Sequence, residues 1–268
     1  MTRHMKRFWN VLLGLFCAGV GLWLIAPSLI VVPLSFTDRP SFAFPPTGWS
    51  TQWYHTFFED PAWISALKAS LEVGILVAVF ATLFGTAAAV ALSRTSLAGR
   101  QGIRAFLLAP MVVPVIVVAV GLYALFLRLN LLGTVFGFVV AHSMLALPFV
   151  IVPVMASLQG FDRRLEDAAA ICGAGRWTTF RTVTLPSVAP GVLSGALFAF
   201  ATSFDEVVLS LFIQNPYLQT LPVKMYASVT RDTDPTIAAA ATLPTPRREL
   251  RAEVFPFTAA GLRTGDRV

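Results

Sequence analysis

The sequence predicts an all-α polytopic membrane protein, and three observations support that fold class. Hydrophobic residues make up 56% of the 268 residues, whereas only 13% are Asp, Glu, Lys or Arg, about half the charged share that is usual in soluble domains. The mean hydropathy is +0.72. The apolar residues are gathered into long runs, and most of the charged residues lie between these runs. A soluble globular protein is therefore excluded.

Five apolar runs exceed the ~20 residues that a helix needs to cross the hydrocarbon core of a bilayer. Proline and glycine inside these runs do not argue against helices, because membrane helices tolerate them where neighbouring groups satisfy the freed backbone. We interpret the first run as a retained span, since no small-residue cleavage site follows it at a suitable distance. The five predicted spans cover residues 8–34, 67–92, 103–127, 131–158 and 187–213.

The basic residues favour a cytoplasmic N-terminus. With that orientation, three Lys and Arg residues precede the first span, three lie between spans two and three, and four lie between spans four and five. Cytoplasmic segments of membrane proteins carry such an excess of basic residues. The net charge of +6 therefore reflects membrane topology, and nucleic acid is not an expected partner.

The C-terminal tail conflicts with this topology. Five spans would leave the basic tail outside, whereas its charges favour the inside. A sixth span should begin near Pro235, but the apolar run 236–243 has eight residues, only ~12 Å as a helix. We interpret residues 244–268 as an atypical charged tail that arose by a shift of reading frame, in preference to a re-entrant stub. Resequencing the 3′ end of the gene tests this interpretation.

Cysteine and histidine indicate neither a disulfide framework nor a metal centre. Cys17 and Cys172 lie at different depths in the predicted topology, so they are not expected to pair. His142 has no second His or Cys near it in the sequence, and we expect it to hydrogen-bond to a neighbouring helix. No metal site and no cofactor is predicted. Four aromatic residues of the external segment are expected to form an interfacial belt and a docking surface: Trp49, Trp53, Tyr54 and Trp63.

The loop between the fourth and fifth spans, residues 159–186, predicts two short helices with a glycine joint. Residues 165–171 are helix-forming with an acidic start, Gly173 and Gly175 interrupt them, and residues 176–183 resume an amphipathic pattern. Such a pair of helices suits docking into a groove on another protein. From composition alone, an ordinary interfacial loop remains the alternative.

The spacing in this loop resembles the EAA loop of the permeases of binding-protein-dependent ABC importers. The second span, SLEVGILVAVFATLFGTAAAVALSR, is similar to the opening of that family's core domain. The segments TLPSVAPGVLSGALFAFATSFDEVVLSLFI and TLPVKMYASV are similar to the polyamine (spermidine and putrescine) permease subfamily. The resemblance covers residues 8–243. The matching loop pattern is Asp167-Ala168-Ala169, three residues, Gly173, nine residues, Val183, one residue and Leu185-Pro186, with Asp167 where the motif has Glu.

The resemblance implies a type I ABC importer permease in the bacterial inner membrane that moves a small solute, a polyamine, by alternating access. It also implies four kinds of partner: the lipid bilayer, a homologous second permease, two ATP-binding cassette ATPase subunits and a periplasmic solute-binding protein. The chain lacks a G-x-x-x-x-G-K-[ST] phosphate loop, so ATP hydrolysis is expected in the partner and the chain itself is not expected to be an enzyme.

In the family, the EAA loop forms a coupling helix that inserts into a cleft of the ATPase. The carboxylate of Glu166 or Asp167 would then meet a basic group on that partner or cap local amides. The residues to which the resemblance gives a coupling role are Glu166, Asp167, Ala168, Ala169, Gly173, Leu185 and Pro186.

The expected organisation follows from the spans and the resemblance together. Residues 1–34 would form the tail and first span, residues 35–66 an external segment, and residues 67–243 the permease core. The family's sixth span is absent after Leu243. We therefore expect the chain as written to assemble poorly.

Acidic residues inside spans are costly and indicate substrate paths by default. Glu72 lies near the external end of the second span, and Asp205 and Glu206 lie about eight residues from the external end of the fifth. On a continuous helix Ser203, Glu206 and Ser210 share a face, whereas Asp205 is rotated by about 100°. Only one of the two adjacent acids is then expected to point into a central path.

A polyamine carries regularly spaced ammonium groups, so its path needs carboxylates, hydroxyls and aromatic faces. Tyr123, Phe204 and Tyr226 are candidates for those faces. The alternative is structural: Glu72 pairs with Lys68, and the acids of the fifth span bond to neighbouring helices. Another small polar solute, and an ATP-independent channel or intramembrane enzyme, are the rival functions. No paired nucleophile and base supports the enzyme.

Overall fold

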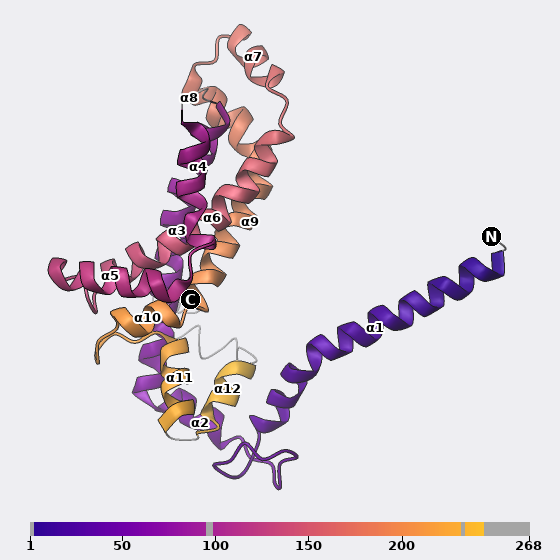
Figure 1. The fold of residues 1–268 in the computed structure, drawn as a ribbon, viewed down its shortest axis with the longest axis vertical. Helices are drawn as coiled ribbons and strands as arrows, with labels where there is room; N and C mark the ends of the chain where they lie inside the picture. Colours follow the sequence, from indigo (N-terminus) through magenta and orange to yellow (C-terminus); the bar gives the residue numbers. More distant parts are fainter. Residues whose placement is uncertain (1–2, 95–98, 232–233, 244–268) are drawn as a thin grey trace, which may run out of the picture. The chain divides into compact units, whose positions relative to one another are not determined.

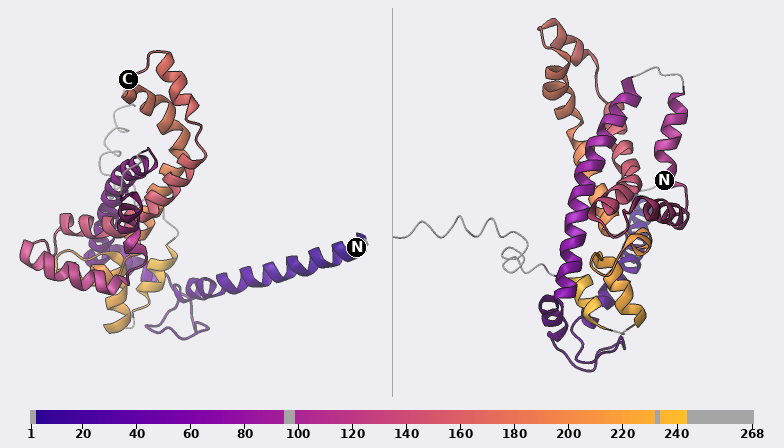
Figure 2. Two further views of the ribbon diagram at one scale, coloured as in Figure 1. Left: turned by 45° about the horizontal axis from the view of Figure 1, so that its top comes forward. Right: turned by 90° about the vertical axis from the view of Figure 1, so that its left-hand side faces the viewer.

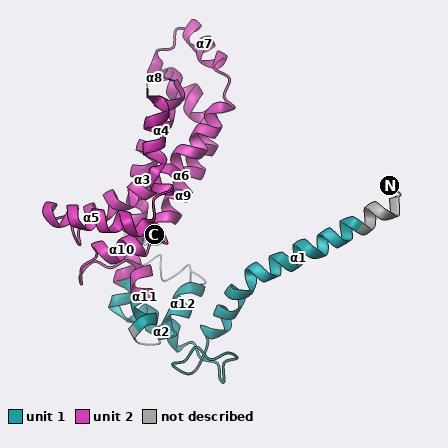
Figure 3. Cartoon of the chain, viewed as in Figure 1, with its two compact units in different colours: residues 1–64, 227–268 teal, residues 65–226 magenta. Residues whose placement is uncertain are grey.

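The computed structural model describes residues 3–94, 99–231 and 234–243, and every regular element in those ranges is helical (Figure 1). The all-α prediction is therefore confirmed for the described residues. The chain divides into two compact units, one made of residues 1–64 with 227–268 and the other of residues 65–226 (Figure 3).

Within the described residues, four helical segments are long and apolar enough to cross a membrane. They are Trp9–Leu34 in α1 (Arg3–Leu34), α3 (Pro61–Arg94), α6 (Val135–Gln159) and the run Arg176–Phe204. That run joins α8 (Arg176–Thr179), the π-turn η2 (Phe180–Thr184) and α9 (Leu185–Phe204).

The third predicted span is not one straight helix. It consists of α4 (Arg100–Leu108) with the 3₁₀ turn η1 (Ala109–Met111), followed after a 97° bend by α5 (Val115–Leu129). Pro114 precedes α5, and proline both lacks an N–H group and disfavours helical geometry in the residue before it. The bent pair counts as a fifth span only if its two parts are taken together.

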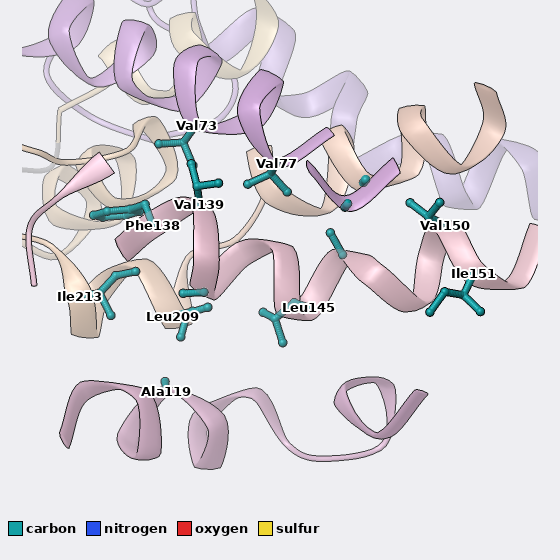
Figure 4. Close-up of a cluster of buried hydrophobic side chains, with 14 of the residues drawn as sticks. Val73, Val77, Ala119, Phe138, Val139, Leu145, Val150, Ile151, Leu209 and Ile213 are labelled. Carbon is teal, nitrogen blue, oxygen red and sulfur yellow. The ribbon is translucent and has the colours of Figure 1, made fainter. Parts of the chain in front are cut away.

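Helix α6 lies at the centre of the unit 65–226. One of its faces packs along α9, and it also contacts α4, η1 and the short helix α10 (Val208–Ile213), which in turn packs on α5. Figure 4 shows the shared core, in which Val73 of α3, Leu145 of α6 and Leu209 of α10 belong to the same apolar interior. Buried side chains of this kind hold the helices together through close packing.

Glycines let three helices approach one another around Val150 of α6. A Cβ atom on Gly85 of α3 would lie 2.8 Å from the Val150 Cβ, and one on Gly195 of α9 would lie 3.0 Å from the Val150 Cα. Either contact is shorter than van der Waals packing allows. Small residues at such points are typical of packed membrane helices.

The unit that contains the N-terminus holds α1, α2 (Gln52–Glu59) and α12 (Thr236–Thr242). The Tyr54 hydroxyl lies 2.8 Å from the Ser35 hydroxyl and 2.9 Å from the Thr242 hydroxyl, and so links α2 to α12 and to the residue that follows α1. Helix α12 has seven residues, in keeping with the short apolar run. The predicted atypical tail, residues 244–268, lies outside the described residues.

The prediction that four aromatic residues of the external segment form an interfacial belt is wrong for Trp63. Trp63 is only 1% exposed, and its ring lies 5.6 Å from that of Phe57. Trp53 donates a 2.7 Å hydrogen bond to the backbone oxygen of Thr37, whereas Trp49 is exposed. An indole is large enough to bury most of its surface against a neighbouring helix.

The close approach at Val150 predicts a test of helix packing. We expect Gly195→Ala to destabilise the protein by about 1–3 kcal/mol, because the new methyl group meets the backbone of Val150, which cannot move away. Gly121→Ala in α5 is the matched control, since a Cβ there meets no atom within 4 Å. Thermal unfolding of the two variants in detergent measures the difference. Equal unfolding temperatures would contradict the packing.

Candidate functional site

The loop 159–186 folds as its spacing predicts. Helix α7 (Arg164–Ile171) is followed by Gly173, whose φ is +86°, and then by α8. A positive φ costs an L-residue with a side chain about 1–2 kcal/mol, whereas glycine adopts it readily. A Cβ on Gly173 would meet no atom within 4 Å, so the glycine is required for the turn and not for space within this chain.

The tip of this loop exposes apolar side chains. Ile171 is 87% exposed and Trp177 is 72% exposed, and the ring of Trp177 stacks on that of Phe180 at 5.8 Å. Asp167 and Ala168 are also exposed, whereas Ala169 is half-buried. Sequence reasoning missed Ile171 and Trp177, although an aromatic and a branched aliphatic residue on either side of a glycine turn are a recognisable signal for a docking surface.

The Glu166 carboxylate is hydrogen-bonded to groups of its own chain. Its Oε1 accepts hydrogen bonds from Arg94 Nη2 at the end of α3 and from the Thr184 hydroxyl at the end of η2. Arg94 Nη2 also lies 3.2 Å from the Thr184 hydroxyl, and Arg163 Nη2 donates a 2.6 Å bond to the carbonyl of Ser93. Asp167 is the exposed carboxylate of the pair, and the expectation that Glu166 or Asp167 meets a basic group on a partner stays a prediction.

The fifth predicted span contains a break that the sequence did not reveal. Helix α9 ends at Phe204, Asp205 has φ −95° and ψ 0°, and α10 begins at Val208. The Glu206 carboxylate accepts a 2.9 Å hydrogen bond from the Leu209 N–H, and so stabilises the start of α10 as capping residues do. The prediction of one continuous helix across residues 187–213 is wrong here.

Both acids line one cavity beside the break between α9 and α10. The cavity has a volume of about 410 Å³ and is lined by Ala201, Thr202, Asp205 and Glu206. Asp205 is exposed and Glu206 is half-buried. The four lining residues are spaced i, i+1, i+4 and i+5, a spacing that places them on one helix face. Both acids therefore line this cavity, and the expectation that only one of them points into a central substrate path stays a prediction.

His142 lies beside this break. Its Nδ1 is 3.0 Å from the hydroxyl of Ser203 in α9, and its Nε2 is 3.0 Å from the hydroxyl of Ser210 in α10. The prediction that His142 hydrogen-bonds to a neighbouring helix is confirmed. The Ser203 hydroxyl is bonded to the imidazole and the residue is buried, and it is not among the residues that line the cavity.

The remaining candidates are not among the residues that line this cavity. Glu72 is exposed on α3 and is not among the cavity-lining residues. Phe204 stacks on Phe200 with ring centroids 5.6 Å apart, while Tyr123 of α5 packs against Phe212 of α10 at 6.5 Å. The part of the chain that the structure describes has no cluster of three or more His, Cys, Asp or Glu residues that could hold a metal ion.

The family of the chain follows from comparison with known proteins. Residues 81–244 match the model of the family described as the binding-protein-dependent transport system inner membrane component. The chain belongs to this family. The permease also shares 34% identity over 234 residues with the spermidine/putrescine transport system permease protein PotC of Escherichia coli, across 87% of this chain and 88% of that one.

Two further relatives and a solved structure agree with this assignment. PotC of Haemophilus influenzae is 34% identical, over 89% of this chain and 92% of that protein. The putrescine transport system permease protein PotI of Escherichia coli is 34% identical, over 82% of this chain and 81% of that protein. A bacterial ABC transporter involved in import of the polysaccharide alginate has a similar fold. Its TM-score is 0.69 at 15% identity, over 90% of this permease and 92% of that chain.

The contacts of Glu166 predict how firmly the loop of this permease is held. We expect Arg94→Gln and Glu166→Gln each to speed tryptic cleavage at the loop arginines up to about fivefold, because a partly exposed ion pair contributes about 1 kcal/mol or less. The double variant should be no more sensitive than either single one. Asp167→Asn, a change at the exposed neighbour, is the control. Additive effects of the two changes would show that Arg94 and Glu166 do not act together.

Proposed function

We propose that this permease imports a polyamine across the bacterial inner membrane by alternating access, and that ATP hydrolysis by partner subunits drives it. The partners are a homologous second permease, two ATP-binding cassette ATPases and a periplasmic solute-binding protein. One observation carries the choice of a cation: Asp205 and Glu206 are adjacent carboxylates that line a single cavity at a helix break. The names of the spermidine and putrescine relatives support the polyamine.

The geometry at the break suits an ammonium group. Oε1 of Glu206 accepts the Leu209 N–H, and a carboxylate retains further lone pairs after one such bond. Asp205 is exposed beside it. A protonated amine that approaches this pair gains charge-assisted hydrogen bonds, which are about twice as strong as neutral ones. Thr202 adds a hydroxyl to the same cavity.

The proposed topology has a cytoplasmic N-terminus and five spans: α1, α3, the bent pair α4 with α5, α6, and the run from α8 to α9. It rests on the basic-residue bias and on the lengths of the helices. Residues 67–243 form the core, with residues 1–34 and 35–66 before it. The charged tail, residues 244–268, lies outside the described residues.

The two proposed activities of the core, coupling to the ATPase and binding of the substrate cation, lie at different ends of it. In Figure 1, α7 and α8 lie at one end of the unit 65–226 and α10 lies towards the other, and Figure 2 shows the same separation from two further sides. The 20 residues of α9 make a rod of about 30 Å between them. We assign the α7 and α8 end to the cytoplasm and the ATPase.

The proposed coupling surface is the exposed part of the loop. Ile171 and Trp177 offer apolar anchors, and Asp167 offers a charge for a basic group on the ATPase. Glu166 acts from within by holding the loop to α3. The remaining motif residues contribute in three ways. Ala168 and Ala169 in α7 are small, Gly173 forms the turn, and Leu185 and Pro186 begin α9.

Removing the charges at the break should weaken polyamine uptake. We expect Asp205→Asn and Glu206→Gln each to raise the KM for putrescine and spermidine about tenfold to hundredfold, because a hydrogen bond to a charged group is worth ~1.5–3 kcal/mol. The Gln side chain keeps an oxygen that can accept the Leu209 N–H, so this change removes the charge while it preserves the start of α10. Uptake of radiolabelled polyamine by a transport-deficient strain measures the effect.

Glu59→Gln, which changes an exposed carboxylate of α2, is the control for this experiment. Normal kinetics of the Asp205→Asn, Glu206→Gln double variant would show that the acids are structural. Uptake of another small polar solute by the unaltered permease, or uptake that persists without the ATPase, would identify one of the rival functions.

The turn at Gly173 should be essential for coupling. We expect Gly173→Val to abolish ATP-driven uptake and to weaken co-purification of the ATPase, because valine at the positive φ of this residue costs about 1–2 kcal/mol or displaces α8. Gly173→Asn should retain more of both activities, since asparagine tolerates the left-handed region. Undiminished association and uptake of Gly173→Val would remove the coupling assignment from this loop.

A further inference from the structure

The helix break that presents the two acids is bridged by one side chain from another helix. His142 lies on α6 and is 1% exposed, and its ring lies 5.6 Å from that of Phe138. Its two nitrogens bond the hydroxyls of Ser203 and Ser210, each at 3.0 Å. Ser203 is in the last turn of α9 and Ser210 is in the first turn of α10, so the imidazole joins both sides of the interruption.

The hydrogen bonds around His142 form a chain with one direction. The Ser210 hydroxyl donates a 2.9 Å bond to the carbonyl oxygen of Glu206. A hydroxyl has a single proton to donate, so while Ser210 bonds this carbonyl, its contact with Nε2 fits the tautomer that carries the ring proton on Nε2. In that tautomer Nδ1 accepts from the Ser203 hydroxyl. The chain runs from Ser203 through His142 and Ser210 to the backbone of Glu206.

This chain ends on the residue that carries one of the two acids. The carbonyl of Glu206 is fixed by Ser210, and its carboxylate is fixed by the Leu209 N–H. Asp205 is held from the other side, where its N–H bonds to the carbonyl of Ala201. Both backbone ends of the break are thus anchored, and on the α10 side the anchoring hydroxyl of Ser210 also contacts His142.

The support for His142 is itself rigid. Helix α6, which carries it, packs along α9 at the close contact between Val150 and Gly195. The apolar residues Phe138 and Leu145 of α6 are also buried. A side chain fixed in a packed helix can hold a partner in place, because its own rotamer is restricted.

We propose that His142 is a positioning residue that holds the α9 to α10 break in the geometry that directs Asp205 and Glu206 into the cavity. The proposal rests on the proposed function for the role of the acids as cation ligands. Without the imidazole, two buried hydroxyls lose a partner in a region where an unsatisfied polar group is costly. The break then shifts to satisfy them, and the two carboxylates move from their present positions on the cavity wall.

The test compares His142→Leu, which removes both hydrogen bonds, with His142→Gln, whose amide again offers one donor and one acceptor. The variants are expressed with the other transport subunits, and the uptake of labelled putrescine is measured per permease molecule in the membrane. We expect His142→Leu to raise the KM about tenfold or more. His142→Gln should restore most of the loss, and Ser203→Ala with Ser210→Ala should reproduce the effect of His142→Leu.

A second measurement does not depend on transport. Thr202→Cys places a thiol on the cavity wall of a permease in which Cys17 and Cys172, both exposed, are replaced by Ser. Its rate of reaction with a cationic thiol reagent reports the local geometry and charge. We expect His142→Leu to change this rate at least about threefold, because nearby carboxylates raise the local concentration of a cationic reagent. In the matched control, Glu72→Cys at an exposed position of α3, the rate should stay unchanged.

The outcomes separate this inference from the proposed function. A changed labelling rate in a permease that transports no polyamine would support the positioning role of His142 and would reject the proposal that the substrate is a polyamine. Unchanged KM and labelling rate in His142→Leu would overturn the inference. A lower amount of folded permease, with KM and labelling rate per molecule unchanged, would also overturn it, because His142 would then contribute to folding alone.

Discussion

The requirement that backbone polar groups be satisfied without water determines this structure. In hydrocarbon an unpaired N–H or C=O group costs several kcal/mol, so a spanning segment stays helical unless other protein groups take over its hydrogen bonds. The break after Phe204 meets this condition with side chains. The N–H of Leu209 bonds to the Glu206 side chain, and the carbonyl of Glu206 accepts from Ser210. An interruption of the helix is thereby tolerated beside two carboxylates that line one cavity.

Helix α9 connects the two ends of the permease core. At one end it continues through η2 and α8 into the exposed loop, and at the other it ends at the acids. The close contacts of Gly195 with Val150 fix α9 against α6, and Arg94 fixes the loop against α3 through Glu166. Packed elements of this kind move as units and do not deform continuously. In the proposed cycle, a displacement of the loop by the ATPase therefore moves the helices that carry the acids.

The sequence predicted what depends on short-range patterns. Hydropathy located α1, α3 and α6, and the acidic start and glycines of the loop indicated α7, the turn at Gly173 and α8. Helix propensity and glycine conformation are local properties, which explains this success. Recognition of the family likewise used local patterns: the spacing within one loop and the resemblance of three continuous segments.

What the sequence could not show depends on residues that are distant along the chain. His142 bonds to residues 61 and 68 positions away, and Arg94 bonds to Glu166 across 72 positions. No periodicity within a single span contains that information. The break at Asp205 is hidden for the same reason, since its stability depends partly on a side chain of α6. The burial of Trp63 is equally hard to predict, because an indole in an external segment suits an interface and a buried position alike.

Glu166 differs from Asp205 and Glu206 in the groups that compensate its charge. This difference supports a structural role for Glu166 and a cation-binding role for the other two acids. Glu166 is paired with a guanidinium and a hydroxyl of its own chain. Its charge is thus already compensated, which suits a residue that holds two elements together. Glu206 receives a backbone N–H, and Asp205 is exposed beside it on the same cavity wall.

Two adjacent carboxylates repel one another, and the repulsion grows where the surroundings are less polar than water. A passing cation relieves that repulsion and gains hydrogen bonds from both groups. The affinity of the proposed site for a cation therefore arises partly from repulsion between the acids. Because this repulsion favours a bound cation only while both charges face the cavity, the backbone geometry at the helix break is part of the proposed binding site.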